Sequence, residues 1–280
     1  ASLGDTLKVI AYDIASMSDM SASNGGTFQA DVTFADGADI ITASAGTDNV
    51  RLGEDAGASI ASGGNQNVLI GKDAGTAITT GDDNVAVGYQ ALDANTTGGN
   101  SVAVGSNALG AQTTGDRNIG IGTSAGEAIT TGQGSIAIGH QALASATTGD
   151  DNIAIGADSP TVNAALEANT TGVQNVAIGG GALAANTTAD KNTALGFQSL
   201  GKNTTANNNT AVGFQALYDN TTGAQNVAVG MFALPNNTSA AYNTAVGYGA
   251  MEANTTGASN TAIGGSALYS ATTASNNTAV

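Results

Sequence analysis

The most regular feature of this sequence is a short apolar pattern that returns along most of its length. It is a pentapeptide with Asn or Ser first, then Val, Ile or Thr, usually Ala, then Val, Ile or Leu, and finally Gly. Its copies end on Gly53, Gly71, Gly88, Gly105, Gly122, Gly139, Gly156, Gly179, Gly196, Gly213, Gly230, Gly247 and Gly264. The sequence numbers of successive glycines differ by 17, except for one interval of 18 and one of 23, which indicates a structural repeat.

Most repeats also hold a second apolar pair and a polar turn. An Ala-Leu pair begins three residues after the glycine, as at Ala216-Leu217, and a Thr-Thr pair follows, as at Thr221-Thr222. Both apolar runs are shorter than the ~10 residues that make a helix worthwhile, and the Thr, Asn and Gly residues between them are poor helix formers. We therefore expect both runs to form strands of roughly 4 to 5 residues.

A strand that recurs with this constant period predicts an all-β fold, a parallel β-solenoid of 17-residue coils. Residues 49–280 would form about thirteen coils that stack roughly 4.8 Å apart and rise roughly 60 Å. The glycine that ends each pentapeptide is expected to turn the chain at positive φ, and the first-position Asn to stack into an amide ladder.

The two faces of the pentapeptide strand predict association between chains. The fourth position is always Val, Ile or Leu, so we expect it to point into the coil. The third position would then face outward as an Ala-lined stripe, longer than soluble monomers leave exposed. We expect identical parallel chains to cover this stripe, and arginine at Ala211 or Ala228 to break the assembly.

Two parts of the chain depart from the repeat. Eight residues, 157–164, separate Gly156 from Ala165 where other coils have two, so six extra residues, including Pro160, should leave the solenoid as a loop. Residues 1–48 lack the repeat altogether. There, Phe28, Ala30, Val32 and Phe34 alternate with polar residues, which predicts a strand ending at the turn Asp36-Gly37.

The rest of the N-terminal segment is less decisive. Thr6–Ile14 fits either a strand or a short helix. Residues 1–48 fit two roles: a small β-rich cap over the first coil, or an adaptor that attaches the rod to a larger particle.

The pentapeptides resemble a known family. Asn100–Gly105, Gly134–Gly139 and Asn175–Gly179 are similar to the head repeats of trimeric autotransporter adhesins of the YadA type. That resemblance covers residues 49–280 and implies a left-handed parallel β-roll wound as a homotrimer. The coil here is longer than that family's usual one, and its form, as in Asn209–Gln225, looks more like fibre and appendage proteins of tailed phages, particularly those of aquatic bacteria.

Composition and charge exclude several classes of function. The chain holds 22 Asp and Glu against 6 Lys and Arg, a net charge of −16, whereas nucleic acids and anionic membrane surfaces need clustered cations. It has no Cys, which removes disulfides and Cys nucleophiles. No stretch approaches ~18 apolar residues, so we expect no membrane insertion.

The residues that could carry chemistry have ordinary explanations. Asp82-Asp83 and Asp150-Asp151 fall at turns between coils, where polar residues are expected, and His140 follows a pentapeptide glycine where other coils have Tyr or Phe. No calcium-binding loop motif is present. We therefore expect no catalytic residue, cofactor or metal, and no enzyme activity. Stacked Thr residues leave ice binding as a further hypothesis, although neighbouring Thr residues should face opposite ways.

The sequence therefore predicts a structural role. The expected function is the homotrimeric shaft of a phage tail fibre or virion appendage, joined through residues 1–48 to other virion proteins and presenting elements that recognise a host-cell receptor. The alternative is the trimeric head of an adhesin on a bacterial surface. Because the sequence stops inside a pentapeptide, at Asn277–Val280, we expect the natural polypeptide to continue.

Overall fold

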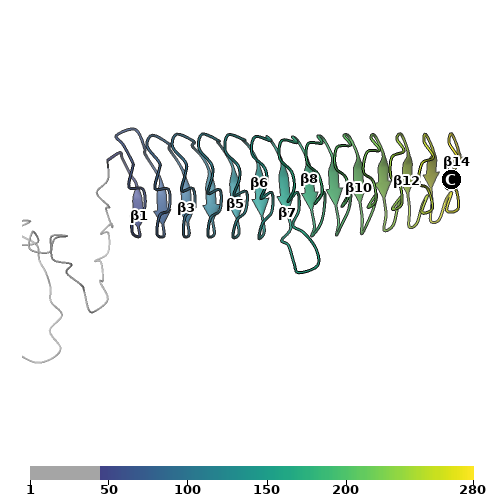
Figure 1. The fold of residues 1–280 in the computed structure, drawn as a ribbon, viewed down its shortest axis with the longest axis horizontal. Coiled ribbons are helices and arrows are strands. Elements are labelled where there is room, and N and C mark those ends of the chain that lie inside the picture. Colours follow the sequence, from purple (N-terminus) through teal and green to yellow (C-terminus); the bar gives the residue numbers. More distant parts are fainter. Residues whose placement is uncertain (1–44) are drawn as a thin grey trace, which may run out of the picture. The chain divides into compact units, whose positions relative to one another are not determined.

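The computed structural model describes residues 45–280, which form a β-solenoid of fourteen parallel strands (Figure 1). The strands are β1 Val50–Leu52, β2 Val68–Ile70, β3 Val85–Val87, β4 Val102–Val104, β5 Ile119–Ile121, β6 Ile136–Ile138, β7 Ile153–Ile155, β8 Val176–Ile178, β9 Thr193–Leu195, β10 Thr210–Val212, β11 Val227–Val229, β12 Thr244–Val246, β13 Thr261–Ile263 and β14 Thr278–Ala279. The all-β solenoid expected from the sequence is confirmed. The expected elements at Thr6–Ile14 and around Phe28–Phe34 lie outside the described residues.

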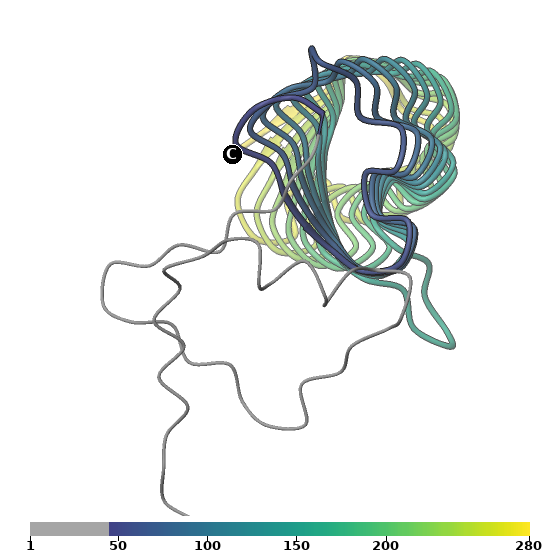
Figure 2. The ribbon, with the colours of Figure 1, turned by 90° about the vertical axis from the view of Figure 1, so that its left-hand side faces the viewer.

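The strands form one sheet in sequence order, and equivalent pentapeptide positions lie side by side. Thr210 pairs with Val227, Ala211 with Ala228 and Val212 with Val229. Viewed along the solenoid, the coils superimpose with a gradual rotation (Figure 2). Each coil therefore presents the same residue at the same place, one strand spacing further along.

The extra residues between β7 and β8 leave this ladder without disturbing it. Ala154 still pairs with Ala177 across the longer connection, just as Ala211 pairs with Ala228 across a regular one. Residues 157–164 project beyond the coils as a loop (Figures 1 and 2). The loop closes on itself through an antiparallel bridge between Ser159 and Val162.

The third pentapeptide position lines the interior of the coil. We expected the fourth position to do so, and that expectation is wrong. Ala211 and Ala228 are fully buried in the core, whereas Val212 and Val229, one position later, are only half-buried on the outer face. The second position, Thr210 for example, faces outward in the same way. The expectation that the Ala face lies toward partner subunits is therefore wrong, because this face is filled by the chain's own core.

The Ala-Leu pair forms the opposite wall of the core but is not a strand. Leu217 is fully buried and has a φ of 53°, a left-handed conformation that few residues other than glycine adopt. Its backbone N–H donates to the carbonyl oxygen of Ala233 in the next coil, at 3.0 Å. Stacked backbone hydrogen bonds thus hold this segment, and the expectation of a strand here is wrong.

Two ladders of buried amides connect the coils. In the first ladder, the Asn226 backbone N–H donates to Asn209 Oδ1 at 2.9 Å, and the Asn243 N–H donates to Asn226 Oδ1 at 3.0 Å. In the second, Asn220 Nδ2 donates to Asn203 Oδ1 at 2.9 Å. The expected ladder at the first pentapeptide position is confirmed, and the second ladder, before the Thr-Thr pair, was not expected.

Candidate functional site

The acidic turns act as structural acceptors. Asp82 Oδ1 accepts the Asn65 backbone N–H at 2.7 Å, and Asp150 Oδ1 accepts the Gln133 N–H at 2.8 Å. Asp83 and Asp151, the other members of these pairs, are exposed at the turn. Each of the accepting carboxylates thus ties its coil to the preceding one, a role that the sequence does not reveal because donor and acceptor lie one full repeat apart.

His140 lies exposed at a corner and contacts the inserted loop. Its Nδ1 lies within hydrogen-bond distance of Asp158 Oδ1. Sequence reasoning placed His140 at the corner but missed this partner, because Asp158 belongs to the insertion. Within residues 45–280, no group of three or more His, Asp and Glu side chains could hold a metal ion.

The two threonines of each turn have different surroundings. Thr221 Oγ1 donates to the Thr238 carbonyl oxygen at 2.9 Å, and the same bond recurs from coil to coil, as from Thr204 to Thr221. The second residue of the pair, such as Thr222, is exposed. The first hydroxyl is engaged with the next coil, whereas the second residue of the pair, Thr in most coils and Ser at Ser239, is exposed at the turn.

The outer face of the sheet is a continuous surface feature of the described residues. It consists of the second and fourth pentapeptide positions, and we call it the outer sheet face. Many of its side chains are half-buried, and some are more open: Leu195 is 44% exposed and Ile263 43%. No charged residue occupies the second or fourth position of any strand from β1 to β14.

Aromatic side chains cluster just after the corner glycines in the C-terminal half. Phe197 and Phe214, each directly after a pentapeptide glycine, stack with ring centroids 5.6 Å apart and an interplanar angle of 9°. Phe232 meets Phe214 edge-on, with centroids 5.4 Å apart. Phe197 and Phe214 remain about two-fifths exposed, so they add apolar surface at the corners that follow β9 and β10.

Comparison with known protein families, curated proteins and solved structures finds no match to this chain. In the part of the chain that the structure describes, no helix has the length and apolar character needed to cross a membrane.

Proposed function

We propose that this chain is the rigid shaft of a homotrimeric fibre, part of a phage tail fibre or another virion appendage. The observation that carries the proposal is the outer sheet face, which is uncharged over all fourteen strands: its fourth position is always Val, Ile or Leu, and its second is Val, Ile or Thr. We propose that three identical chains lie parallel and bury these faces around a common axis.

The size of the outer sheet face supports a partner along its whole length. Thirteen strand intervals of ~4.8 Å span roughly 60 Å, and three residues span roughly 10 Å, giving roughly 600 Å². That area is at the upper limit of the apolar patches of soluble monomers and approaches the ~800 Å² that each partner buries in a standard interface.

The spacing of the side chains supports another copy of this chain as the partner. Val212, Val229 and Val246 recur once per strand, so a second surface fits along the full length only if its side chains repeat with the same rise. A copy of this chain has that rise. Each chain is strongly acidic, but the outer sheet face carries no charge. Two chains can therefore bring these faces together, because their carboxylates lie in the turns.

A shaft needs stiffness and a length set by the number of repeats. Strand pairing and the Asn and Thr ladders tie each coil to the next. Such a shaft would hold a host-recognition element away from the particle, with residues 1–48 joining it to other virion proteins. The 17-residue form of the repeat favours the virion over the alternative, the head of a bacterial surface adhesin.

The assembly is tested by sedimentation equilibrium of the 280-residue chain. We expect a mass three times the 27.0 kDa of one chain. Placing lysine at Val212, Val229 and Val246 together should give folded monomers, because the charges fall on the outer sheet face. The control places lysine at the exposed turn residues Thr205, Thr222 and Ser239 and should stay trimeric. A folded monomer or a dimer of the unmodified chain would overturn the trimer.

The location is tested by immunogold electron microscopy with antibody against the repeats. We expect label on the tails or appendages of virus particles. Label on the surface of uninfected bacteria, with none on particles, would favour the adhesin and contradict the virion assignment.

A further inference from the structure

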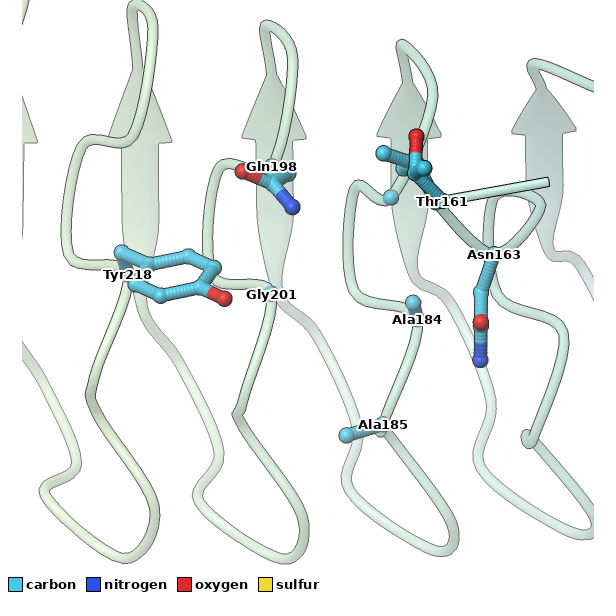
Figure 3. A pocket seen from close by; sticks show the side chains of 9 residues that line it. Thr161, Asn163, Ala184, Ala185, Gln198, Gly201 and Tyr218 are labelled. Atoms are coloured by element: carbon cyan, nitrogen blue, oxygen red, sulfur yellow. The ribbon is translucent and has the colours of Figure 1, made fainter. Parts of the chain in front are cut away.

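A groove of about 220 Å³ lies between the inserted loop and the three coils that follow it (Figure 3). Thr161 and Asn163 of the loop line one end, and Tyr218 lines the other. Gln198 lies between them, over a floor that includes Gly181 and Gly201. From the loop to Tyr218 the groove crosses three coil intervals, roughly 14 Å.

The groove exists because two coils lack a side chain. Gly181 takes the place that Gln198 and Gln215 hold in the next two coils, and an added Cβ there would lie 2.9 Å from both Gln198 Cγ and Val162 Cγ1. Gly201 takes the place of Tyr218, and an added Cβ would lie 2.9 Å from Tyr218 Cε2. Gln198 and Tyr218 therefore each lie over a glycine of the preceding coil, as Figure 3 shows for Tyr218 and Gly201.

Four neutral polar side chains from the loop and two separate coils surround this space. Asn163 and Gln198 contribute amides, and Thr161 and Tyr218 contribute hydroxyls, each group able both to donate and to accept hydrogen bonds. Gln198 Oε1 accepts from Gln215 Nε2 at 2.7 Å, so the Gln198 amide is held in place while its Nε2 can donate to a ligand. The Tyr218 ring adds an apolar surface.

The charges near the groove already have partners. Lys202 Nζ lies 2.6 Å from Asp219 Oδ1 and 4.8 Å from the centre of the Tyr218 ring. The hydrogen bond to Asp219 raises the pKa of Lys202, so the ammonium stays charged and paired. Glu167, which holds the position of Ala184 one coil earlier, accepts the Ala164 N–H at 2.8 Å. The groove thus offers no free cation to an anionic ligand.

We propose that this groove binds a short neutral oligosaccharide. Sugar hydroxyls both donate and accept hydrogen bonds, as the amides and hydroxyls here do. The C–H faces of a sugar ring match the apolar lining of Ala184, Ala185 and the Tyr218 ring. The site lies within one chain, on the segment after the corner glycine and away from the outer sheet face. It does not require the trimer, and a shaft without sugar binding would leave the proposed function intact.

The test is binding of the full chain to an array of neutral oligosaccharides of glucose, galactose, mannose and N-acetylglucosamine, with sialylated and uronic-acid oligosaccharides alongside. Titration calorimetry then measures the affinity of the strongest neutral binder. We expect Tyr218→Ala and Gln198→Ala each to weaken it at least about tenfold. Tyr269→Ala is the matched control, since Tyr269 holds the same place three coils later and does not line the groove; its affinity should be unchanged.

Three outcomes would overturn the proposal. They are no binding of any neutral oligosaccharide, binding of anionic oligosaccharides alone, and binding that survives both Tyr218→Ala and Gln198→Ala. Circular dichroism and the sedimentation mass of each variant separate loss of the groove from loss of the fold or of the assembly.

Discussion

Ile129 Cδ1 lies 3.0 Å from the point at which Gly126 would carry a Cβ atom. In the preceding coil, Leu109 occupies the place of Gly126, and Gln112 that of Ile129. The isoleucine therefore fills from the turn side the space that leucine fills in most other coils. The same exchange, Gly with Ile three residues later, occurs at Gly57 with Ile60 and at Gly75 with Ile78.

This exchange predicts strong coupling between positions 126 and 129. Gly126→Leu alone should cost about 1–3 kcal/mol by overpacking, and Ile129→Asn alone about 2–4 kcal/mol by leaving a cavity. Together they recreate the common coil, in which Asn95 Nδ2 donates to the Gly98 carbonyl oxygen at 2.9 Å, and the double variant should be within about 1 kcal/mol of the unmodified chain. Denaturant titration measures all three. If the destabilisation of the double variant equals the sum for the two single variants, Gly126 and Ile129 are not coupled and the exchange is contradicted.

The first amide ladder should tolerate serine better than alanine. Asn226 Nδ2 donates to the Ala240 carbonyl oxygen at 2.9 Å, and its Oδ1 accepts the Asn243 N–H at 3.0 Å. Asn226→Ala leaves both partners buried and unpaired, at a cost of about 2–5 kcal/mol. Asn226→Ser should cost less, because Ser135 at this position still accepts the Asn152 N–H at 3.2 Å. The melting temperatures should fall in the order Asn, Ser, Ala, and an equal loss for Ser and Ala would count against the ladder.

The corner glycines serve two purposes: they adopt a positive φ, and they let the next coil stack closely. Comparing Gly213 with Gly264 distinguishes the contribution of each. Gly213 has a φ of 130°, and an added Cβ would lie 2.7 Å from the Gly230 carbonyl carbon. Gly264, in the last coil of the 280-residue chain, has a φ of 126° and nothing within 4 Å of that point. Gly213→Ala should therefore lower the melting temperature clearly more than Gly264→Ala, which adds only backbone strain. Equal effects would mean that stacking contributes little.

The period, the parallel register and the Asn ladder could be predicted because each is repeated many times in the sequence. The assignment of faces could not. Alternation separates Ala211 from Val212, but it does not say which of them faces the core. The opposite wall decides this: Leu217 fills the narrow interior and leaves room for a methyl group at Ala211, so the larger side chains face outward.

Other features depend on contacts between coils that a single repeat does not show. A leucine in the left-handed conformation, such as Leu217, is destabilised by about 1–2 kcal/mol when nothing compensates. The residue types alone therefore predict a strand for this segment. Stacked backbone bonds offset this destabilisation in every coil. The groove depends on Gly181 and Gly201, which look like ordinary turn glycines in the sequence. What sets them apart is that side chains of the next coil, Gln198 and Tyr218, pack against them.

The inserted loop should be dispensable for the solenoid. Replacing residues 157–164 with His-Gln restores the two-residue connection seen at His140-Gln141. The strand ladder on either side is already continuous, Ala154 with Ala177, while the loop's bridge from Ser159 to Val162 is internal to the loop. We expect the melting temperature to change by less than about 3 °C, because the one fully buried side chain that is removed, Ala164, is only a methyl group. A fall of about 10 °C or more would show that the loop supports the adjoining coils.

Because the replacement removes Thr161 and Asn163 from the groove, the same variant should lose oligosaccharide binding while it keeps its stability and its assembled mass.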